Sequence, residues 1–469
     1  ASQASQGEAN PTEEFVTLRI LMPGDPSARM NDFMKNELNA KLKEELNCNI
    51  EFVYSPWSDY WNTVNMELGA GQPYDLFWDA STYFSTRVSQ QAYTELNDLL
   101  DQYGPALKEK IAQAQFDAYT IDGKLYALPM NEDPAGMYRS VCVRQDILEE
   151  VGMTTIETKE DLFEYLEKGK AAHPEMDGVA GSLAWILSKY GLADHTITQL
   201  GTNDIAFVIE EEEEPTVHSW FESEEFKTNC EIMNDLYQKG LEPDWVLTNL
   251  GDAYTKFSAG QLLMYRGTGG TTALNEQIIK QGSGNPDATL REYKLYPDKP
   301  DYFTTASNNL LVIPAASENP ERAMMFVNWM VESQENYDFM VYGVEGTDYT
   351  LEGDRVNRTV TDEFFPGWML LNSMGRYTTA DSEEGIKTVQ NWNEGAKYSK
   401  AFGFIFDESP VAAEKAKIDA VVQEGFSPML AGIIPYEGNY ESAIAQLKDA
   451  GLDAYLAELQ NQFTEFASK

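Results

Sequence analysis

The chain has 469 residues, with 34 Lys and Arg against 77 Asp and Glu, which gives a formal net charge of −43 at pH 7. A charge of this size repels nucleic-acid phosphates and anionic lipid surfaces, so we expect neither as a partner. The length suits two or three domains, and 42% hydrophobic with 12% aromatic residues exclude a disordered chain.

Cysteine and histidine are scarce in this chain. The three cysteines are widely spaced and show neither a disulfide framework nor a zinc-ligand spacing, although one pair could still meet in the fold: Cys48, Cys142 and Cys230. The three histidines are isolated, and none belongs to an HxxxH or HExxH pattern: His173, His195 and His218. We therefore expect no metal, no cofactor and no catalytic histidine.

Predicted strands and helices alternate after a polar start. Residues 1–14 are rich in Ser, Gln and Glu, which is typical of a flexible tether. The pattern that follows predicts strands over 15–22, 49–54 and 73–78 and helices over 31–45 and 59–68. This order predicts an α/β lobe around a largely parallel sheet. Ligands of such sheets bind beyond the carboxyl ends of the strands, which draws attention to Trp57 and Trp78.

The segment 121–152 carries the strongest motif. It begins Ile-Asp-Gly-Lys-Leu-Tyr-Ala-Leu-Pro, where Asp122-Gly123 predicts a tight turn, and it continues into a strand and a helix that ends at Gly152. The phrase resembles "DGKxYGLP … LYYNKDLFEKAG" of the family 1 extracellular solute-binding proteins. These are the sugar-capturing subunits of bacterial ABC importers.

Further segments carry the same resemblance nearly from Phe15 to the end of the chain. Residues 254–267 and 306–330 resemble two interior phrases of the family, and 403–411 resembles the "GFxFDxSPV" segment of its larger Gram-positive members. Residues 365–372 resemble their "W…GN" element, except that Leu371 replaces the usual glycine, which leaves the role of Asn372 open.

The resemblance implies a two-lobe periplasmic-binding-protein type II fold with an interlobe hinge. We expect 15–137 with 271–315 to form the N-terminal lobe and 138–270 with 316–469 the C-terminal lobe, with the hinge near Tyr138, Arg266 and Asn309. The family further implies a monomer that captures an oligosaccharide in the interlobe cleft and delivers it to the membrane permease of an ABC importer. It also implies a place on the extracellular face of the cell membrane, with a lipid anchor on a removed N-terminal segment.

A sugar pocket needs aromatic faces for pyranose rings and planar polar groups for hydroxyls. The aromatic candidates lie in or beside predicted loops: Trp57, Trp78, Tyr83, Trp185, Trp368 and Trp392. The polar candidates lie in loops expected to face the other lobe: Asp79, Glu132, Asp133 and Arg266. Each tryptophan could instead belong to a core, and each charged group could form a structural ion pair. Trp329 has helical spacing with apolar neighbours and is assigned to the core.

Two other classes of function stay open at this point. A secreted glycoside hydrolase or lyase would need two carboxyl groups about 5–9.5 Å apart, and 77 acidic residues supply many chance pairs. A surface adhesin is the weaker alternative. No GxSxG nucleophile motif is present, and no stretch approaches the ~20 apolar residues of a membrane helix. The sequence therefore favours a binding protein that performs no chemistry.

Overall fold

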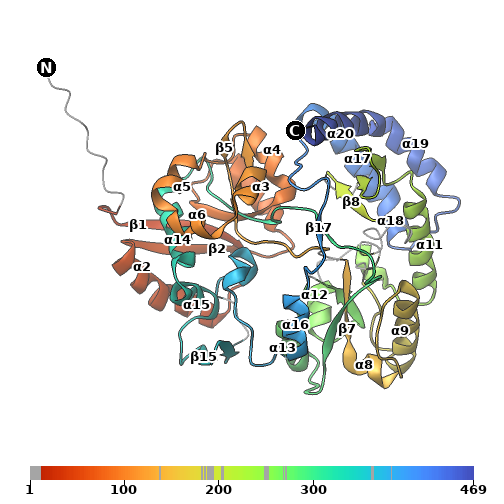
Figure 1. Ribbon diagram of the computed structural model, residues 1–469, viewed down its shortest axis with the longest axis horizontal. Helices are drawn as coiled ribbons and strands as arrows, with labels where there is room; N and C mark the ends of the chain where they lie inside the picture. The colour runs from red at the N-terminus through yellow and green to blue at the C-terminus, as the bar shows by residue number, and fades with distance from the viewer. Residues whose placement is uncertain are drawn as a thin grey trace. The chain divides into compact units, whose positions relative to one another are not determined.

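The computed structural model describes residues 12–136, 139–180, 183, 186, 195–201, 205–247, 253–267, 269, 272–360, 364–381 and 383–468, without the side chains of 272–275 and 384. These residues form two compact units (Figure 1), and the chain passes between them three times. Unit 1 contains the described residues of Ala1–Glu132 and Ala306–Tyr377, and unit 2 those of Asp133–Thr305 and Thr378–Lys469. Both units combine helices with sheets, which confirms the predicted α/β class.

A five-stranded sheet organises unit 1. Its strands follow the order β2 (Cys48–Ser55), β1 (Val16–Pro23), β3 (Leu76–Ala80), β14 (Asn309–Val312) and β6 (Leu128–Pro129). The first three strands are parallel, as predicted, whereas β14 runs antiparallel to β3 and pairs Asn309 with Ala80. The start of β14 therefore lies at the carboxyl edge of the parallel strands.

Helices and short elements complete unit 1. They are α1 (Ala28–Phe33), η1 (Met34–Leu38), α2 (Asn39–Glu45), α3 (Tyr60–Gly69), η2 (Ser81–Tyr83), α4 (Phe84–Ser89), α5 (Asn97–Tyr103), α6 (Pro105–Lys110), α7 (Gln113–Ala118), β4 (Thr120–Ile121), β5 (Lys124–Leu125), α14 (Pro320–Glu332), α15 (Gln334–Tyr342), β15 (Tyr349–Glu352), β16 (Arg355–Arg358), η5 (Gly367–Met369) and η6 (Asn372–Met374).

Helix α14 is buried in unit 1 against segments that are distant in the sequence. Pro320 occupies its first turn, where a missing N–H costs nothing, and its apolar residues recur at helical spacing. Trp329 is 3% exposed and donates from Nε1 to Glu45 Oε2 at 2.6 Å, which confirms its assignment to the core. In Figure 1, α14 lies beside α5 and α6 although it is distant in sequence.

Unit 2 is built on smaller sheets. Strand β7 (Ser140–Arg144) lies between β11 (Met264–Arg266) and β12 (Leu290–Lys294) and is antiparallel to both. The others are β8 (Ile197–Leu200) with β9 (Ala206–Ile209) and β10 (His218–Ser219), and the parallel pair β13 (Tyr302–Phe303) and β17 (Lys397–Tyr398). The remaining elements are α8 (Gln145–Glu150), α9 (Lys159–Ala172), α11 (Glu224–Gln238), η3 (Asp244–Leu247), α12 (Ala253–Ser258), α13 (Thr272–Gly282), α16 (Glu383–Gln390), η7 (Ser409–Val411), α17 (Ala412–Val421), η8 (Val422–Phe426), α18 (Ser427–Leu430), α19 (Tyr440–Ala450) and α20 (Leu452–Ala467).

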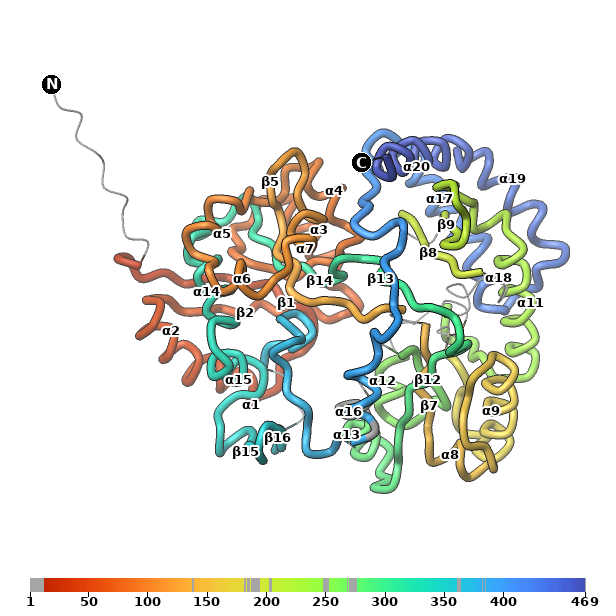
Figure 2. Tube along the Cα trace, viewed as in Figure 1, coloured from red at the N-terminus to blue at the C-terminus, as the bar shows by residue number. Residues whose placement is uncertain are grey.

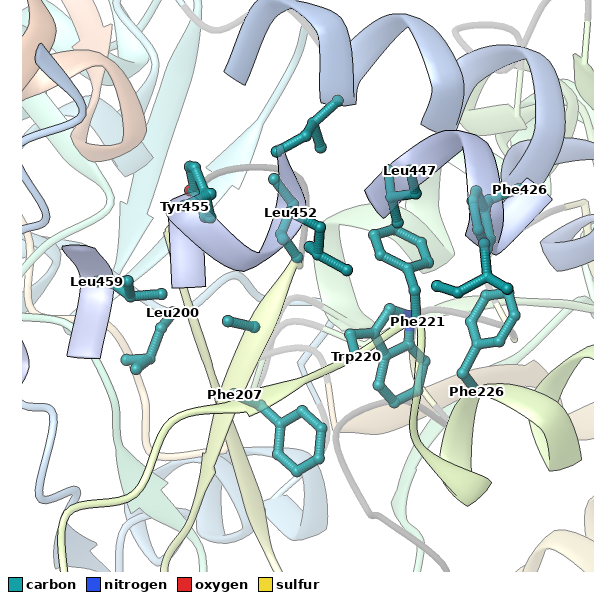
Figure 3. Close-up of a cluster of buried hydrophobic side chains, with 14 of the residues drawn as sticks. Leu200, Phe207, Trp220, Phe221, Phe226, Phe426, Leu447, Leu452, Tyr455 and Leu459 are labelled. Carbon is teal, nitrogen blue, oxygen red and sulfur yellow. The ribbon is translucent and has the colours of Figure 1, made fainter. Parts of the chain in front are cut away.

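The largest apolar cluster described in unit 2 joins α11 to the C-terminal helices. Figure 3 shows the rings of Trp220, Phe221, Phe226 and Phe426 close together, with Leu447 beside them. Helix α11 begins at Glu224 and is capped by Ser223, whose hydroxyl accepts from Phe226 N at 3.1 Å. The cap therefore fixes the start of the helix beside this cluster. The last third of the chain therefore completes the core of unit 2.

The lobe boundaries differ from the predicted ones in three segments. Residues 133–136 were expected in the N-terminal lobe but lie in unit 2. Residues 271–305 were expected in the N-terminal lobe but lie in unit 2, because β12 pairs with β7 from Leu290 to Lys294. Residues 316–377 were expected in the C-terminal lobe but lie in unit 1, where α14 packs on α5 and α6. Figure 2 follows this return of the chain through β14 and α14 before the trace continues to the C-terminal helices. Tyr138, one of the predicted hinge positions, lies outside the described residues.

The cysteines and histidines have ordinary structural surroundings. All three cysteines are buried and free: Cys48, Cys142 and Cys230. Each histidine lies within ion-pair distance of a glutamate: His173, His195 and His218. Within the described part of the chain, no group of three or more His, Cys, Asp or Glu is arranged to hold a metal ion. None of the described helices is both long and apolar enough to cross a membrane.

Candidate functional site

The carboxyl edge of the unit 1 sheet carries a group of aromatic side chains. Strand β2 ends at Ser55, whose carbonyl accepts from Gly24 N at 2.8 Å, so the ends of β1 and β2 are tied together. Gly24 has a φ of +108°, which favours glycine, and an added Cβ would lie 3.7 Å from the Trp57 Nε1. Trp57 follows two residues after Ser55, and Trp78 lies on β3, which pairs with the other side of β1.

Trp78 forms the base of this group. Its ring meets that of Trp57 edge-on at a centroid distance of 5.6 Å and that of Trp368, from η5, at 5.2 Å. Trp57 and Trp368 lie 5.9 Å apart with their planes 35° from parallel. Trp61 contacts Trp78 at 4.9 Å and Tyr83 at 4.7 Å. Edge and tilted contacts of this kind stabilise aromatic groups beyond their buried area.

Exposure separates the base from the outer rings. Trp57 is 53% exposed and Trp368 is 36% exposed, whereas Trp78 is 7% exposed. Trp61 and Tyr83 are half-buried. We call Trp57, Trp61 and Trp368, which contact Trp78, together with Tyr83, which contacts Trp61, the unit 1 aromatic surface. Its outer rings offer open apolar faces on a rigid base, which suits a ligand that stacks.

Amides and hydroxyls surround the aromatic rings. Trp78 donates from Nε1 to Asn309 Oδ1 at 3.0 Å, which fixes the base ring to the start of β14. The next residue back, Asn308, accepts at Oδ1 from the Ser81 hydroxyl at 3.2 Å and is half-buried. Because β14 starts at this edge, the sheet brings polar groups close to Trp78.

The predicted contact Glu132 is exposed, and its backbone forms hydrogen bonds with Asn372, whose role the sequence leaves open. Asn372 Nδ2 donates to the Glu132 carbonyl at 2.8 Å, and Glu132 N donates to Asn372 Oδ1 at 3.5 Å. Asn372 therefore holds the backbone at Glu132. The Glu132 side chain faces solvent, and its role in binding stays a prediction.

Asp79 does not lie on the exposed surface, in contrast to its predicted role. Its side chain is fully buried, lies 2.8 Å from Arg87 Nε and accepts from the Tyr93 hydroxyl at 2.6 Å. Burial raises the pKa of Asp79 to about 6, against the opposing effects of Arg87 and Tyr93. The sequence placed Asp79 at a strand end, but the groups that bury it come from the following helix and loop. We therefore assign Asp79 to the support of β3.

The unit 2 candidates that the structure describes do not form one exposed group. Asp133 is 5% exposed and accepts from the Thr305 hydroxyl at 3.2 Å. Trp392 is also 5% exposed, and its Nε1 donates to the Ala135 carbonyl at 3.0 Å. These buried contacts correct the expectation that both side chains face a ligand. Arg266 is half-buried beside Tyr265, and Trp185 lies outside the described residues.

The sequence-based selection missed Trp61. It lies inside the predicted helix 59–68 and contacts both Trp78 and Tyr83 from the first turn of α3. The available signal was its place in the first turn of the helix that follows β2, beside the strand end that carries Trp57.

Comparison with known proteins identifies the family. A family model described as bacterial extracellular solute-binding protein matches residues 27–337. The chain belongs to this family. A second model, described as a domain of unknown function (DUF3502), matches residues 400–468, which include the segment with the resemblance to larger Gram-positive members.

Individual members of the family align along nearly the whole chain. A carbohydrate ABC transporter substrate-binding protein of Streptococcus pneumoniae serotype 4 is 23% identical over 462 residues, which cover 96% of this chain and 90% of the relative. The N-glycan transport solute binding protein NgtS of S. pneumoniae, in complex with Man1GlcNAc, has a TM-score of 0.80 at 19% identity and covers 97% of this chain and 100% of its own. The alginate-binding protein AlgQ2 has a TM-score of 0.69 at 15% identity, with 97% and 99% covered. These structures confirm the predicted two-domain solute-binding-protein fold.

Proposed function

We propose that this solute-binding protein captures an oligosaccharide through the unit 1 aromatic surface and delivers it to the membrane permease of an ABC importer. The observation that carries the proposal is the exposure of Trp57 and Trp368 over the buried ring of Trp78. Large tryptophan faces left open to water at the carboxyl edge of an α/β sheet are costly unless they serve binding. No bond is made or broken in this function.

Sugar chemistry fits this surface. The C–H faces of a pyranose stack on indole rings, while its hydroxyls need amides and hydroxyls at the rim, such as Asn308 and Ser81. The nearby cation Arg87 is 4% exposed and ion-paired with Asp79, so it does not offer its charge to an anionic sugar. With a net charge of −43, we propose a neutral or weakly charged glycan.

The comparisons support the transport role. The curated relative is named as a carbohydrate ABC transporter substrate-binding protein, and NgtS was solved in complex with Man1GlcNAc and with Man5GlcNAc. By this likeness we propose an extracellular location, a lipid anchor on an N-terminal segment, and the permease subunits as partners. The same likeness to transport proteins favours a binder over a glycoside hydrolase or lyase.

Replacing Trp57 or Trp368 by alanine should weaken glycan binding by about 1–3 kcal/mol each, because each variant loses an exposed stacking face. The measurement is titration calorimetry with neutral oligosaccharides identified on a glycan array. Trp57→Ala and Trp368→Ala should leave the unfolding transition nearly unchanged, since both rings are partly exposed. Trp78→Ala should lower both affinity and stability, because Trp78 is the buried base.

Phe15→Ala is the matched control. Phe15 is 48% exposed and precedes β1, so it lies at the amino end of the same sheet. Its replacement should leave affinity within experimental error. Unchanged affinity in both tryptophan variants would exclude the unit 1 aromatic surface as the binding site. Recovery of the glycan as fragments after incubation would refute transport without chemistry and favour the hydrolase or lyase.

A further inference from the structure

A buried ion pair contacts the unit 1 aromatic surface. Asp79 is 0% exposed and Arg87 is 4% exposed, and Arg87 Nε lies 2.8 Å from Asp79 Oδ2. The Tyr93 hydroxyl donates to the same carboxylate oxygen at 2.6 Å, and Ala80 N donates to Asp79 Oδ1 at 2.8 Å. A charge without access to water needs such partners. Asp79 therefore holds a buried cation at a fixed place.

The segment that carries Tyr93 is joined to the unit 1 sheet. Tyr93 forms an antiparallel bridge with Pro314, two residues after the end of β14. Thr94 N donates to the Ile313 carbonyl at 2.9 Å. Asp79 itself belongs to β3, which pairs with β14. The carboxylate and the hydroxyl that donates to it thus both rest on neighbouring strands of one sheet.

Arg87 links this ion pair to the rings of the surface. Its guanidinium carbon lies 5.2 Å from the centre of the Tyr83 ring, within the distance at which a cation is attracted to an aromatic face. The Tyr83 ring lies 4.7 Å from that of Trp61, which lies 4.9 Å from that of Trp78. The buried cation is therefore connected through Tyr83 to Trp61.

Tyr83 depends on these ring contacts for its position. It is half-buried and ends η2, an element of three residues. Among the residues that the structure describes, its hydroxyl has no hydrogen-bond partner. An aromatic side chain held by neither full burial nor a hydrogen bond can change its rotamer. A ligand that binds such a ring has to restrict this freedom, which lowers its affinity.

We propose that Arg87, held by Asp79, is a positioning residue of the unit 1 aromatic surface, which fixes the Tyr83 ring, and through it Trp61, in the orientation that the oligosaccharide meets. This inference rests on the proposed function. Arg87 is too deeply buried to touch the ligand itself. A ring fixed in advance loses less conformational freedom on binding, so the ion pair raises the affinity without adding a contact.

The first test is titration calorimetry of the full chain with neutral oligosaccharides, from disaccharides to heptasaccharides. Arg87→Met, which keeps the length of the side chain but removes its charge, should weaken binding about tenfold. Arg87→Lys should stay within about threefold of the native affinity, because it restores the cation. Lysine can serve here, since Arg87 Nη2 has no hydrogen-bond partner in the described part of the chain and the planar fork is not used.

A double-mutant cycle tests whether the effect of Arg87 passes through Tyr83. Tyr83→Ala should itself weaken binding, because it removes a ring of the surface. In the Tyr83→Ala background, Arg87→Met should change the affinity by less than about twofold, since the ring that the cation holds is gone. An equal loss in the two backgrounds would overturn the inference.

Fluorine NMR of the chain labelled with fluorinated tryptophan gives a readout that needs no ligand. The Trp61 signal, assigned through Trp61→Phe, should shift or broaden in Arg87→Met and keep its native position in Arg322→Met. Arg322 is the matched control, because it is 2% exposed and its Nη1 donates to the carbonyls of Leu46 and Asn47. These carbonyls lie just before β2, at the amino end of the sheet. Arg322→Met should therefore lower stability and leave glycan affinity unchanged.

The outcomes separate this inference from the proposed function. If Trp57→Ala weakens glycan binding while Arg87→Met retains the native affinity, the positioning role is refuted and the unit 1 aromatic surface stands. If Arg322→Met loses as much affinity as Arg87→Met, the loss comes from reduced stability, and the inference is equally refuted. If the native chain binds no oligosaccharide of the series, the proposed function falls and the inference falls with it.

Discussion

Replacing Phe226 by alanine should lower the free energy of unfolding by about 3–5 kcal/mol, the range for deleting a fully buried aromatic side chain. Phe226 is 0% exposed, with ring centroids 5.5 Å from Phe221, 5.5 Å from Phe426 and 6.0 Å from Trp220. Trp220 and Phe221 precede α11 and Phe426 belongs to η8, so the rings around Phe226, labelled in Figure 3, come from separate segments and no single element can fill the cavity.

Denaturant unfolding monitored by fluorescence and circular dichroism would measure this loss. The loss of stability should fall on the unfolding transition of unit 2, because Phe226 belongs to unit 2. The tryptophans of the unit 1 aromatic surface report on the unfolding of the other unit. Phe15→Ala, at a 48% exposed ring, should change stability by no more than about 0.5 kcal/mol. A loss below about 1 kcal/mol in Phe226→Ala would mean that the cluster collapses around the cavity.

Local patterns in the sequence were enough to find the elements that build the sheet of unit 1. The strand predicted over 49–54 lies within β2 (Cys48–Ser55), and that predicted over 15–22 matches β1 (Val16–Pro23) to within one residue at each end. Alternating apolar residues and the glycines and prolines that end these runs act within a few residues of each other. They therefore leave a readable signal.

Contacts between distant segments left no such signal. Trp368 joins Trp57 and Trp78 only because η5 returns to the sheet edge late in the chain. The buried side chain of Asp79 is paired with Arg87 and Tyr93, and no sequence pattern identifies these two residues as its partners. The same is true of β12, which pairs with β7 across a long separation and so moves a lobe boundary.

Replacing Asp348 by asparagine should lower stability by about 2–3 kcal/mol at pH 7, because it removes one partner of a largely buried ion pair. The Asp348 side chain is 2% exposed and accepts from Arg29 Nε at 2.7 Å and Nη2 at 2.6 Å, which joins α1 to the turn before β15. Arg29 keeps Glu37 at 3.0 Å, which limits the loss.

The loss should depend on pH. Burial opposes ionisation of Asp348, but the hydrogen bonds from Arg29 and from Val344 N outweigh burial and hold the pKa of this carboxyl below its usual value. A lowered pKa adds stability that is complete above the unfolded value of about 3.9 and is lost as the pH falls through the folded value. The difference in the free energy of unfolding between the native chain and Asp348→Asn should thus be constant from pH 6 to 8 and shrink below about pH 4.

Asp32→Asn is the control, because Asp32 is 58% exposed and contacts the same guanidinium at 3.1 Å. Its effect on the free energy of unfolding should not exceed about 0.5 kcal/mol. If the loss of stability in Asp348→Asn were equally large at pH 3, the loss would come from the altered hydrogen bonding and packing of asparagine, and the charge of Asp348 would contribute little.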